Sequence, residues 1–256
     1  MNKTSTMDFM DFSFKGKKLS DFGWYVGGND GGIKSYSVLP SRTYVTDHSI
    51  GMDGETVYAS RLEPRAFELC IFNENLQDGD IRKLAGWLDS PTPQKFYYVG
   101  DDVYCMACLD SQAFEAENFG MVAGQVVLKF MMHDPHYYNL TPTTRTINDL
   151  KSGTTYTFKN NSTAEIFPFI QVGCSGSLKI EVYDGDNNLL STTNVTNITG
   201  GVKIFCETQD ATLLSTAPHF QYIDTFPVFP ECGDFKMKFT GSNVSSAVVE
   251  YTEKFK

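Results

Sequence analysis

The sequence predicts a mainly β protein built from two domains. Aromatic residues make up 14% of the 256 residues, and aromatic side chains favour strands over helices. Short apolar segments bounded by Gly-, Asn- and Asp-rich turns recur along the chain, and a single segment has the periodicity of a helix. A linker-like stretch follows residue 139. We therefore expect an N-terminal domain over residues 1–139 and a C-terminal β-sandwich over residues 140–256.

Extended patterns dominate the start of the chain. They cover residues 12–14, 20–26, 33–39 and 66–72. The segment 42–60 mixes strand formers with turn formers and contains Asp53-Gly54, which is a hairpin signal.

One helix is expected directly after these strands. Asp78 is a favourable N-cap, and Asp80 lies in the first turn, where the helix dipole stabilises an anion. The apolar residues that recur at helical spacing are Ile81, Leu84, Trp87 and Leu88. We expect both tryptophans, Trp24 and Trp87, to be core residues.

A hairpin and a long strand complete the N-terminal domain. Residues 95–99 and 103–109 flank the tight turn Gly100-Asp101-Asp102, and one strand is expected from about Glu117 to Met132. The C-terminal half then shows seven short strands at roughly ten-residue spacing, which is typical of a β-sandwich or jelly roll. They cover residues 155–159, 164–172, 177–183, 201–206, 211–215, 235–239 and 247–251.

Charge and composition argue against several classes of protein. The formal net charge is −10, whereas a protein that binds nucleic acid through phosphates normally carries a basic face. No apolar run reaches the roughly 18 residues of a membrane span, and Asp8 and Asp11 interrupt any signal peptide at the start. We expect a cytosolic product, whose six cysteines are reduced and mostly buried.

Residue patterns that could support chemistry each have a simpler structural interpretation. Cys105 and Cys108 form a C-x-x-C motif, but inside a strand rather than at a helix start, so packed thiols are favoured over a metal or redox site. His133 and His136 surround a strand-ending proline. The segment 184–188 begins like a calcium loop but lacks the later ligands, and favours a turn.

No catalytic constellation emerges. Glu115 and Glu117 lie two residues apart on one strand, which does not place two carboxylates on opposite sides of a sugar. We expect neither an enzyme nor a bound cofactor or metal.

Several segments resemble the distal tail proteins (Dit) of siphophages, and together they span nearly the whole chain. In the first half the resemblance rests on residues 12–16, 20–24, 66–75, 82–88, 97–104 and 134–137. In the second half it rests on residues 158–160, 164–170, 226–228 and 233–234, which resemble the family's galectin-like C-terminal domain. The resemblance implies a C-terminal galectin-like β-sandwich (jelly roll).

The resemblance also implies a structural function at the phage tail tip. Such proteins form a homo-hexameric ring through their N-terminal domains, and the ring joins the end of the tail tube, with its major tail protein, to the tail-associated hub protein. Their C-terminal domains anchor receptor-binding or baseplate proteins. The expected location is the virion, after assembly in the host cytoplasm, without sequence-specific nucleic-acid binding or a membrane span.

We expect the ring interface at two turn-rich segments with scattered apolar residues. The candidate residues are Gly28, Asn29, Asp30, Gly31, Tyr44, Val45, Ile50, Met52, Val57 and Tyr58.

The alternative function is a carbohydrate-binding β-sandwich that contacts the host cell wall, because sugar sites combine an aromatic platform with nearby polar groups. Its candidate contact residues for a sugar or partner are Tyr183, His219, Phe220 and Tyr222.

Overall fold

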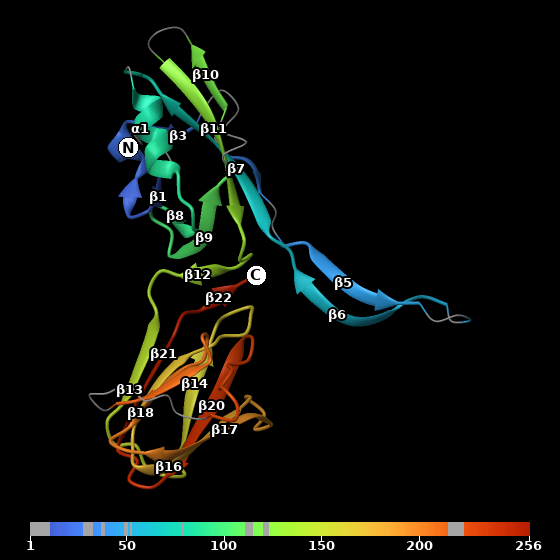
Figure 1. Cartoon of the computed structure of the whole chain (residues 1–256), viewed down its shortest axis with the longest axis vertical. Coiled ribbons are helices and arrows are strands. Elements are labelled where there is room, and N and C mark those ends of the chain that lie inside the picture. Colours follow the sequence, from blue (N-terminus) through green and yellow to red (C-terminus); the bar gives the residue numbers. More distant parts are fainter. Residues whose placement is uncertain are drawn as a thin grey trace, which may run out of the picture. The chain divides into compact units, whose positions relative to one another are not determined.

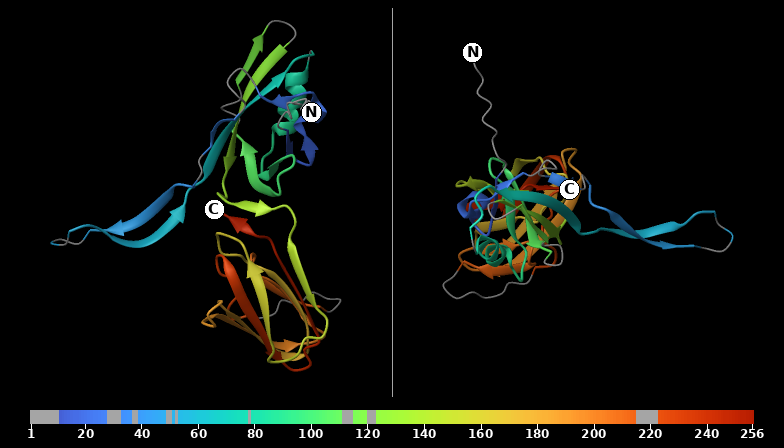
Figure 2. Two further views of the ribbon diagram at one scale, coloured as in Figure 1. Left: turned by 180° about the vertical axis from the view of Figure 1, so that it is seen from behind. Right: turned by 90° about the horizontal axis from the view of Figure 1, so that it is seen from above.

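The structure is a computed structural model in which two units are built mainly from strands (Figures 1 and 2). It describes residues 11–27, 33–36, 39–48, 51, 53–77, 79–110, 115–119, 123–214 and 223–256. The chain divides into an N-terminal unit, Met1–Tyr137 with Lys256, and a C-terminal unit, Tyr138–Phe255. The described residues contain one α-helix, so the prediction of a mainly β protein is confirmed.

A twisted antiparallel sheet forms the body of the N-terminal unit. Its strand order is β2 (Lys17–Lys18), β1 (Phe12–Phe14), β8 (Gln94–Tyr98), β9 (Val103–Leu109), β11 (Ala123–Met132), β7 (Arg65–Asn73) and β3 (Tyr25–Val26); β10 (Glu115–Phe119) pairs with β11 and β4 (Ile33–Tyr36) with β7. The long β7–β11 pair runs in register from Gly124 opposite Asn73 to Met132 opposite Arg65. Along β7 buried and half-buried residues mostly alternate, as the sequence predicts.

Two expectations about the strands of this unit are wrong. The single strand expected from Glu117 to Met132 is two strands, β10 and β11, which fold back on each other so that Glu115 lies opposite Val127. The extended segment expected over residues 20–26 begins as a short 3-10 helix, η1 (Leu19–Phe22). The Asp11 carboxylate fixes this turn by accepting hydrogen bonds from the Ser20 amide (3.2 Å) and hydroxyl (2.7 Å).

The helix α1 (Asp80–Leu88) packs its apolar side against β1. Leu84, Trp87 and Leu88 are buried, and the Trp87 indole N–H donates to the Phe14 carbonyl oxygen (3.0 Å). The helix begins one residue later than expected, since Gly79, in a left-handed conformation, occupies the N-cap position. The expected cap, Asp78, lies outside the described residues.

Aromatic rings fill the core of the N-terminal unit. Phe130 lies at its centre, 5.0 Å from Phe96 and 5.3 Å from Phe67 between ring centroids. Trp24 and Trp87 are both buried, which confirms their expected place in the core. Aromatic packing of this kind contributes both buried area and ring–ring attraction.

A two-stranded hairpin projects from the N-terminal unit (Figure 1). Its strands, β5 (Arg42–Asp47) and β6 (Thr56–Leu62), pair only with each other among the described residues. The chain enters β7 directly after β6, so the hairpin is an extension at the beginning of the longest strand pair of the unit.

Two antiparallel sheets build the C-terminal unit. The first has the order β13 (Thr143–Ile147), β21 (Ser246–Tyr251), β15 (Phe169–Gly173), β18 (Val202–Phe205), β19 (Asp210–Leu213); the second has the order β14 (Thr155–Asn160), β20 (Gly233–Gly241), β16 (Gly176–Tyr183), β17 (Leu189–Ile198). Two short strands, β12 (Tyr137–Asn139) and β22 (Lys254–Phe255), lie near its chain ends.

Residues from both sheets join one buried cluster, so the C-terminal unit is a sandwich. Ile170 and Val172 come from the first sheet, whereas Phe235, Met237 and Phe239 alternate inward from the second. The galectin-like topology that the resemblance implies remains a prediction.

Candidate functional site

The projecting hairpin exposes four large apolar side chains. The exposed fractions are 56% for Tyr44, 59% for Val45, 55% for Val57 and 67% for Tyr58. These four residues belong to the predicted ring interface, and the structure brings them together on one two-stranded element. An isolated two-stranded hairpin is marginally stable in water, and exposed apolar groups on it favour a partner surface.

The register of the hairpin decides which side chains share a face. Tyr44 lies opposite Ser60, and Arg42, two residues earlier, lies on the same face because side chains alternate along a strand. The Arg42 guanidinium donates to the Ser60 hydroxyl (2.7 Å). A bulge between Val45 and Thr46 leaves Tyr58 as the extra residue of β6.

Charges at the base of the hairpin are only partly paired. Arg61 contacts the Glu63 carboxylate (3.0 Å), and the Glu63 amide donates to the Ser41 carbonyl oxygen (2.8 Å), which closes the base. Hydrogen bonds from Thr43 and Arg61 hold the pKa of Glu63 below its usual value. No ion pair of Arg42 is found in the described part of the chain.

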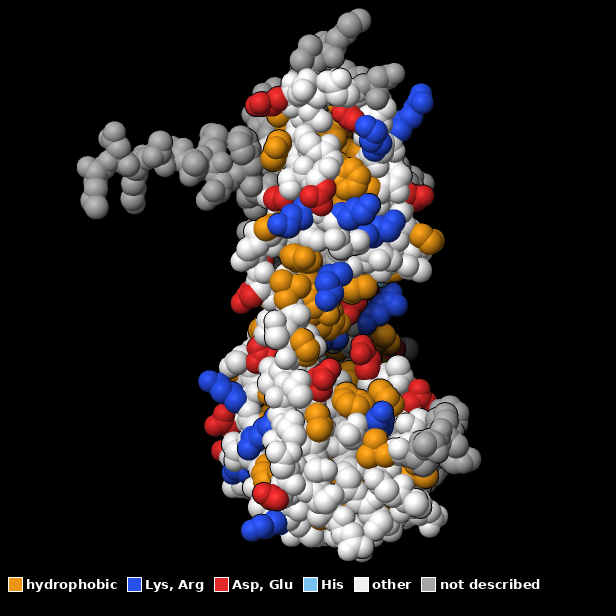
Figure 3. All heavy atoms as spheres, turned by 90° about the vertical axis from the view of Figure 1, so that its left-hand side faces the viewer, with side chains coloured by type: hydrophobic (Ala, Val, Ile, Leu, Met, Phe, Trp, Pro, Cys, Tyr) orange, Lys and Arg blue, Asp and Glu red, His pale blue; other side chains and the backbone are white. Residues whose placement is uncertain are grey.

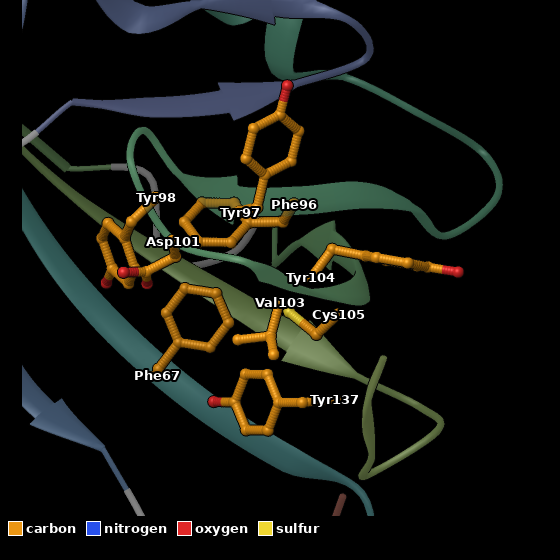
Figure 4. A pocket seen from close by; sticks show the side chains of 9 residues that line it. All are labelled: Phe67, Phe96, Tyr97, Tyr98, Asp101, Val103, Tyr104, Cys105 and Tyr137. Carbon is orange, nitrogen blue, oxygen red and sulfur yellow. The ribbon is translucent and has the colours of Figure 1, made fainter. Parts of the chain in front are cut away.

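A cavity of about 300 Å³ opens in the body of the same unit (Figure 4). It is lined by Phe67, Phe96, Tyr97, Tyr98, Asp101, Val103, Tyr104, Cys105 and Tyr137. In the close-up, the Tyr104 side chain points away from the cavity. The cavity is therefore an aromatic pocket with one carboxylate at its border.

Burial sets the protonation of the groups around this cavity. It raises the pKa of the Cys105 thiol to about 12, so the thiol stays protonated at neutral pH. Burial also raises the pKa of the Tyr98 hydroxyl, and Tyr137, Cys105 and the Asp101 carboxylate act in the same direction. The Arg65 guanidinium lies 5.3 Å from the centre of the Tyr137 ring.

The other predicted interface and contact residues are only partly described. Gly28, Asn29, Asp30, Gly31, Ile50 and Met52 lie outside the described residues, as do His219, Phe220 and Tyr222. Tyr183 lies half-buried at the end of β16. The predicted sugar or partner contact therefore stays a prediction.

The motifs that could have carried metal chemistry have structural roles. Cys105 is buried in the core, and the Cys108 thiol donates to the Met131 carbonyl oxygen (3.7 Å). His136 contacts the Asp134 carboxylate (2.5 Å). No cluster of three or more His, Cys, Asp or Glu side chains suited to a metal is found among the described residues.

The segment that begins like a calcium loop is a turn, as predicted. The Asp184 carboxylate accepts hydrogen bonds from the Asn188 amide and side chain (both 2.8 Å). The Lys236 ammonium donates to the Asn187 side-chain oxygen (2.6 Å), so a protein cation already binds this loop.

The surface carries charges of both signs. On the face shown in Figure 3, acidic and basic side chains are interspersed with apolar ones. Within the described part of the chain, no helix has the length and apolar character needed to cross a membrane.

Comparisons with known proteins agree with this fold. Residues 7–132 match a family model described as the phage tail protein N-terminal domain. A search of curated proteins finds no match. The N-terminal region of the chain is therefore similar to the N-terminal domains of phage tail proteins.

One solved structure extends the likeness of fold over 96% of this chain. The SPP1 Dit protein, described as a paradigm of the hub adsorption apparatus in phages infecting Gram-positive bacteria, shares the fold with a TM-score of 0.70 and 17% identity over 96% of this chain and 99% of its own. A chain of the phage P2 baseplate in its activated conformation with Ca matches at a TM-score of 0.48 and 12% identity, over 96% and 98% of the two chains. The chain has the fold of a distal tail protein, and the resemblance seen in the sequence is confirmed.

The cavity is the feature that the sequence did not reveal. Its lining comes from β7, the β8–β9 hairpin and the residue that begins β12, which are distant in sequence. The available signal is the density of tyrosines around one tight turn, at Tyr97, Tyr98 and Tyr104.

Proposed function

We propose that the protein is a structural component of the phage tail tip that assembles into a hexameric ring. In this role the N-terminal units form the ring between the end of the tail tube and the tail-associated hub protein. The C-terminal units anchor receptor-binding or baseplate proteins. The protein is not an enzyme, and it is assembled into the virion in the host cytoplasm.

The observation that carries the proposal is the exposed hairpin. Its four apolar side chains are more than half exposed, and each would gain burial stabilisation in an interface. A closed ring requires head-to-tail contacts between two different surfaces of each copy. A projecting arm on one side of a compact body supplies one of these surfaces.

The family and the overall acidity support the same role. SPP1 Dit, whose fold this chain shares, is described as part of a hub adsorption apparatus. A net charge of −10 suits a ring through which DNA passes without binding. The segment Gly28–Gly31 remains a second proposed contact, which a deletion tests through the mass of the assembly.

The hairpin can be tested by removing its exposed rings. We expect the double variant Tyr44→Ser, Tyr58→Ser to weaken association of the full chain by at least about 100-fold, because buried tyrosines are frequent interface hot spots. Sedimentation velocity over a range of concentrations measures the change.

The matched control removes apolar side chains elsewhere. Leu189 and Leu190 are 54% and 46% exposed in the C-terminal unit, and their replacement by Ser should leave the assembly unchanged. The proposed role of the hairpin is wrong if the tyrosine variant sediments like the unmodified protein.

A further inference from the structure

We propose that the aromatic cavity of one copy receives Tyr44 from the hairpin of the adjacent copy, with Arg42 of the hairpin facing Asp101 at the cavity border. This inference rests on the proposed ring and identifies the surface that receives the hairpin. It joins two features of the N-terminal unit that otherwise have no assigned contact.

The cavity has the size and the chemistry to hold one tyrosine ring. Its volume of about 300 Å³ exceeds that of a tyrosine side chain, and Phe67, Phe96 and Tyr98 line it. The Phe96 ring stands nearly perpendicular to the Tyr98 ring, at 87° and 5.4 Å. Such walls present both a face and an edge to an incoming ring, which is the arrangement that aromatic pairs prefer.

Charge complementarity selects Tyr44 as the inserted residue. Arg42 lies on the Tyr44 face of the hairpin, whereas the second arginine, Arg61, is already paired with Glu63. At the cavity, Asp101 is exposed in the β8–β9 turn, and no ion pair of its carboxylate is found among the described residues. Insertion of Tyr44 would bring the guanidinium of Arg42 to the side of the cavity that carries this carboxylate.

The contact has to form between copies. Tyr44 is 56% exposed in its own chain, and both views show the hairpin directed away from the body of its unit (Figures 1 and 2). The hairpin leads into β7, which carries the cavity residue Phe67. A hairpin inserted into this cavity would therefore lie beside the base of the receiving copy's own hairpin. Repetition of this head-to-tail contact can close a ring.

A charge swap tests the inference on the full chain. Asp101→Lys should weaken association about tenfold at low salt, because it places like charges at the contact. Adding Arg42→Asp should restore the affinity. Asp102→Lys is the matched control, since Asp102 is exposed in the same turn and does not line the cavity, and it should leave association unchanged.

A cross-link gives a second, independent readout. Under mild oxidation, in a background that carries Cys232→Ser to remove the exposed native thiol, Arg42→Cys combined with Asp101→Cys should give disulfide-linked oligomers on a non-reducing gel, and each single variant should give none. The inference is overturned if the ring forms but the swap shows no rescue, or if Tyr58→Cys cross-links to Asp101→Cys and Arg42→Cys does not. If the unmodified protein forms no ring at all, the proposed function fails instead.

Discussion

At the level of single residues, the outer face of the second sheet contains a buried carboxylate. Glu181 is 7% exposed on β16, and its carboxylate contacts the ammonium groups of Lys179 (2.7 Å) and Lys238 (3.4 Å). The hydrogen bond from Lys179 holds the pKa of Glu181 below its usual value, and Lys238 acts in the same direction. A carboxylate buried in this way stabilises the fold only while it is ionised and paired.

This arrangement makes stability depend on pH. A carboxylate whose pKa is lower in the folded state contributes its full stabilisation above the unfolded value of 4.5, and loses it as the pH falls through the folded value. We expect Glu181→Gln to lower the free energy of unfolding by about 1–2 kcal/mol at neutral pH. The difference in the free energy of unfolding between this variant and the unmodified protein should shrink below pH 4.5.

Urea unfolding at several pH values measures this effect. Glu207→Gln, at an exposed position, is the control and should change little at any of them. If Glu181→Gln lowered the free energy of unfolding by the same amount down to strongly acidic pH, the ionised carboxylate would not be the stabilising group.

At the level of elements, two glycines show how backbone environment decides the effect of one methyl group. A side chain at Gly241 on β20 would meet the Ser177 carbonyl oxygen and lie 3.3 Å from the Leu178 Cα atom of the paired strand. Gly86 lies inside α1, and apart from its chain neighbours and the backbone of the helix itself no atom lies within 4 Å of such a group. The first glycine is required by a close approach of strands, and the second is not.

Alanine at the two positions should therefore act in opposite directions. Gly241→Ala is expected to lower the free energy of unfolding by about 1–3 kcal/mol because the strands must separate. Gly86→Ala should raise it by about 0.5–1 kcal/mol, since alanine favours the helix. Thermal unfolding of both variants measures whether stability falls for Gly241→Ala and rises for Gly86→Ala. Equal changes in stability would contradict the claim that the close approach of β16 and β20 requires glycine at position 241.

The elements that sequence reasoning missed lack the usual apolar signals. β17 (Leu189–Ile198) is a ten-residue strand, but its sequence is rich in Thr and Asn, which is typical of a loop. Pairing with β16 makes it a strand, and Thr193 is buried there opposite Ile180. β7, α1 and the β8–β9 hairpin could be predicted because their apolar periodicity is local.

At the level of the whole molecule, the aromatic residues have three structural roles. Many fill the two cores, others line the cavity, and two tyrosines are exposed on the hairpin. The hairpin could be proposed as an interface from its composition, because apolar residues in a turn-rich segment have no local partner; the structure shows that four of them are exposed, and their role in an interface stays a prediction. The cavity could not, because it forms only when β7 and the β8–β9 hairpin meet in the folded unit.

Assembly into a closed ring is the central claim, and the mass of the unmodified chain in solution tests it most directly. Multi-angle light scattering across a concentration series should reach about six times the 28.6 kDa of one chain, or a multiple of that mass. A mass that stays at 28.6 kDa at the highest concentration would contradict the claim.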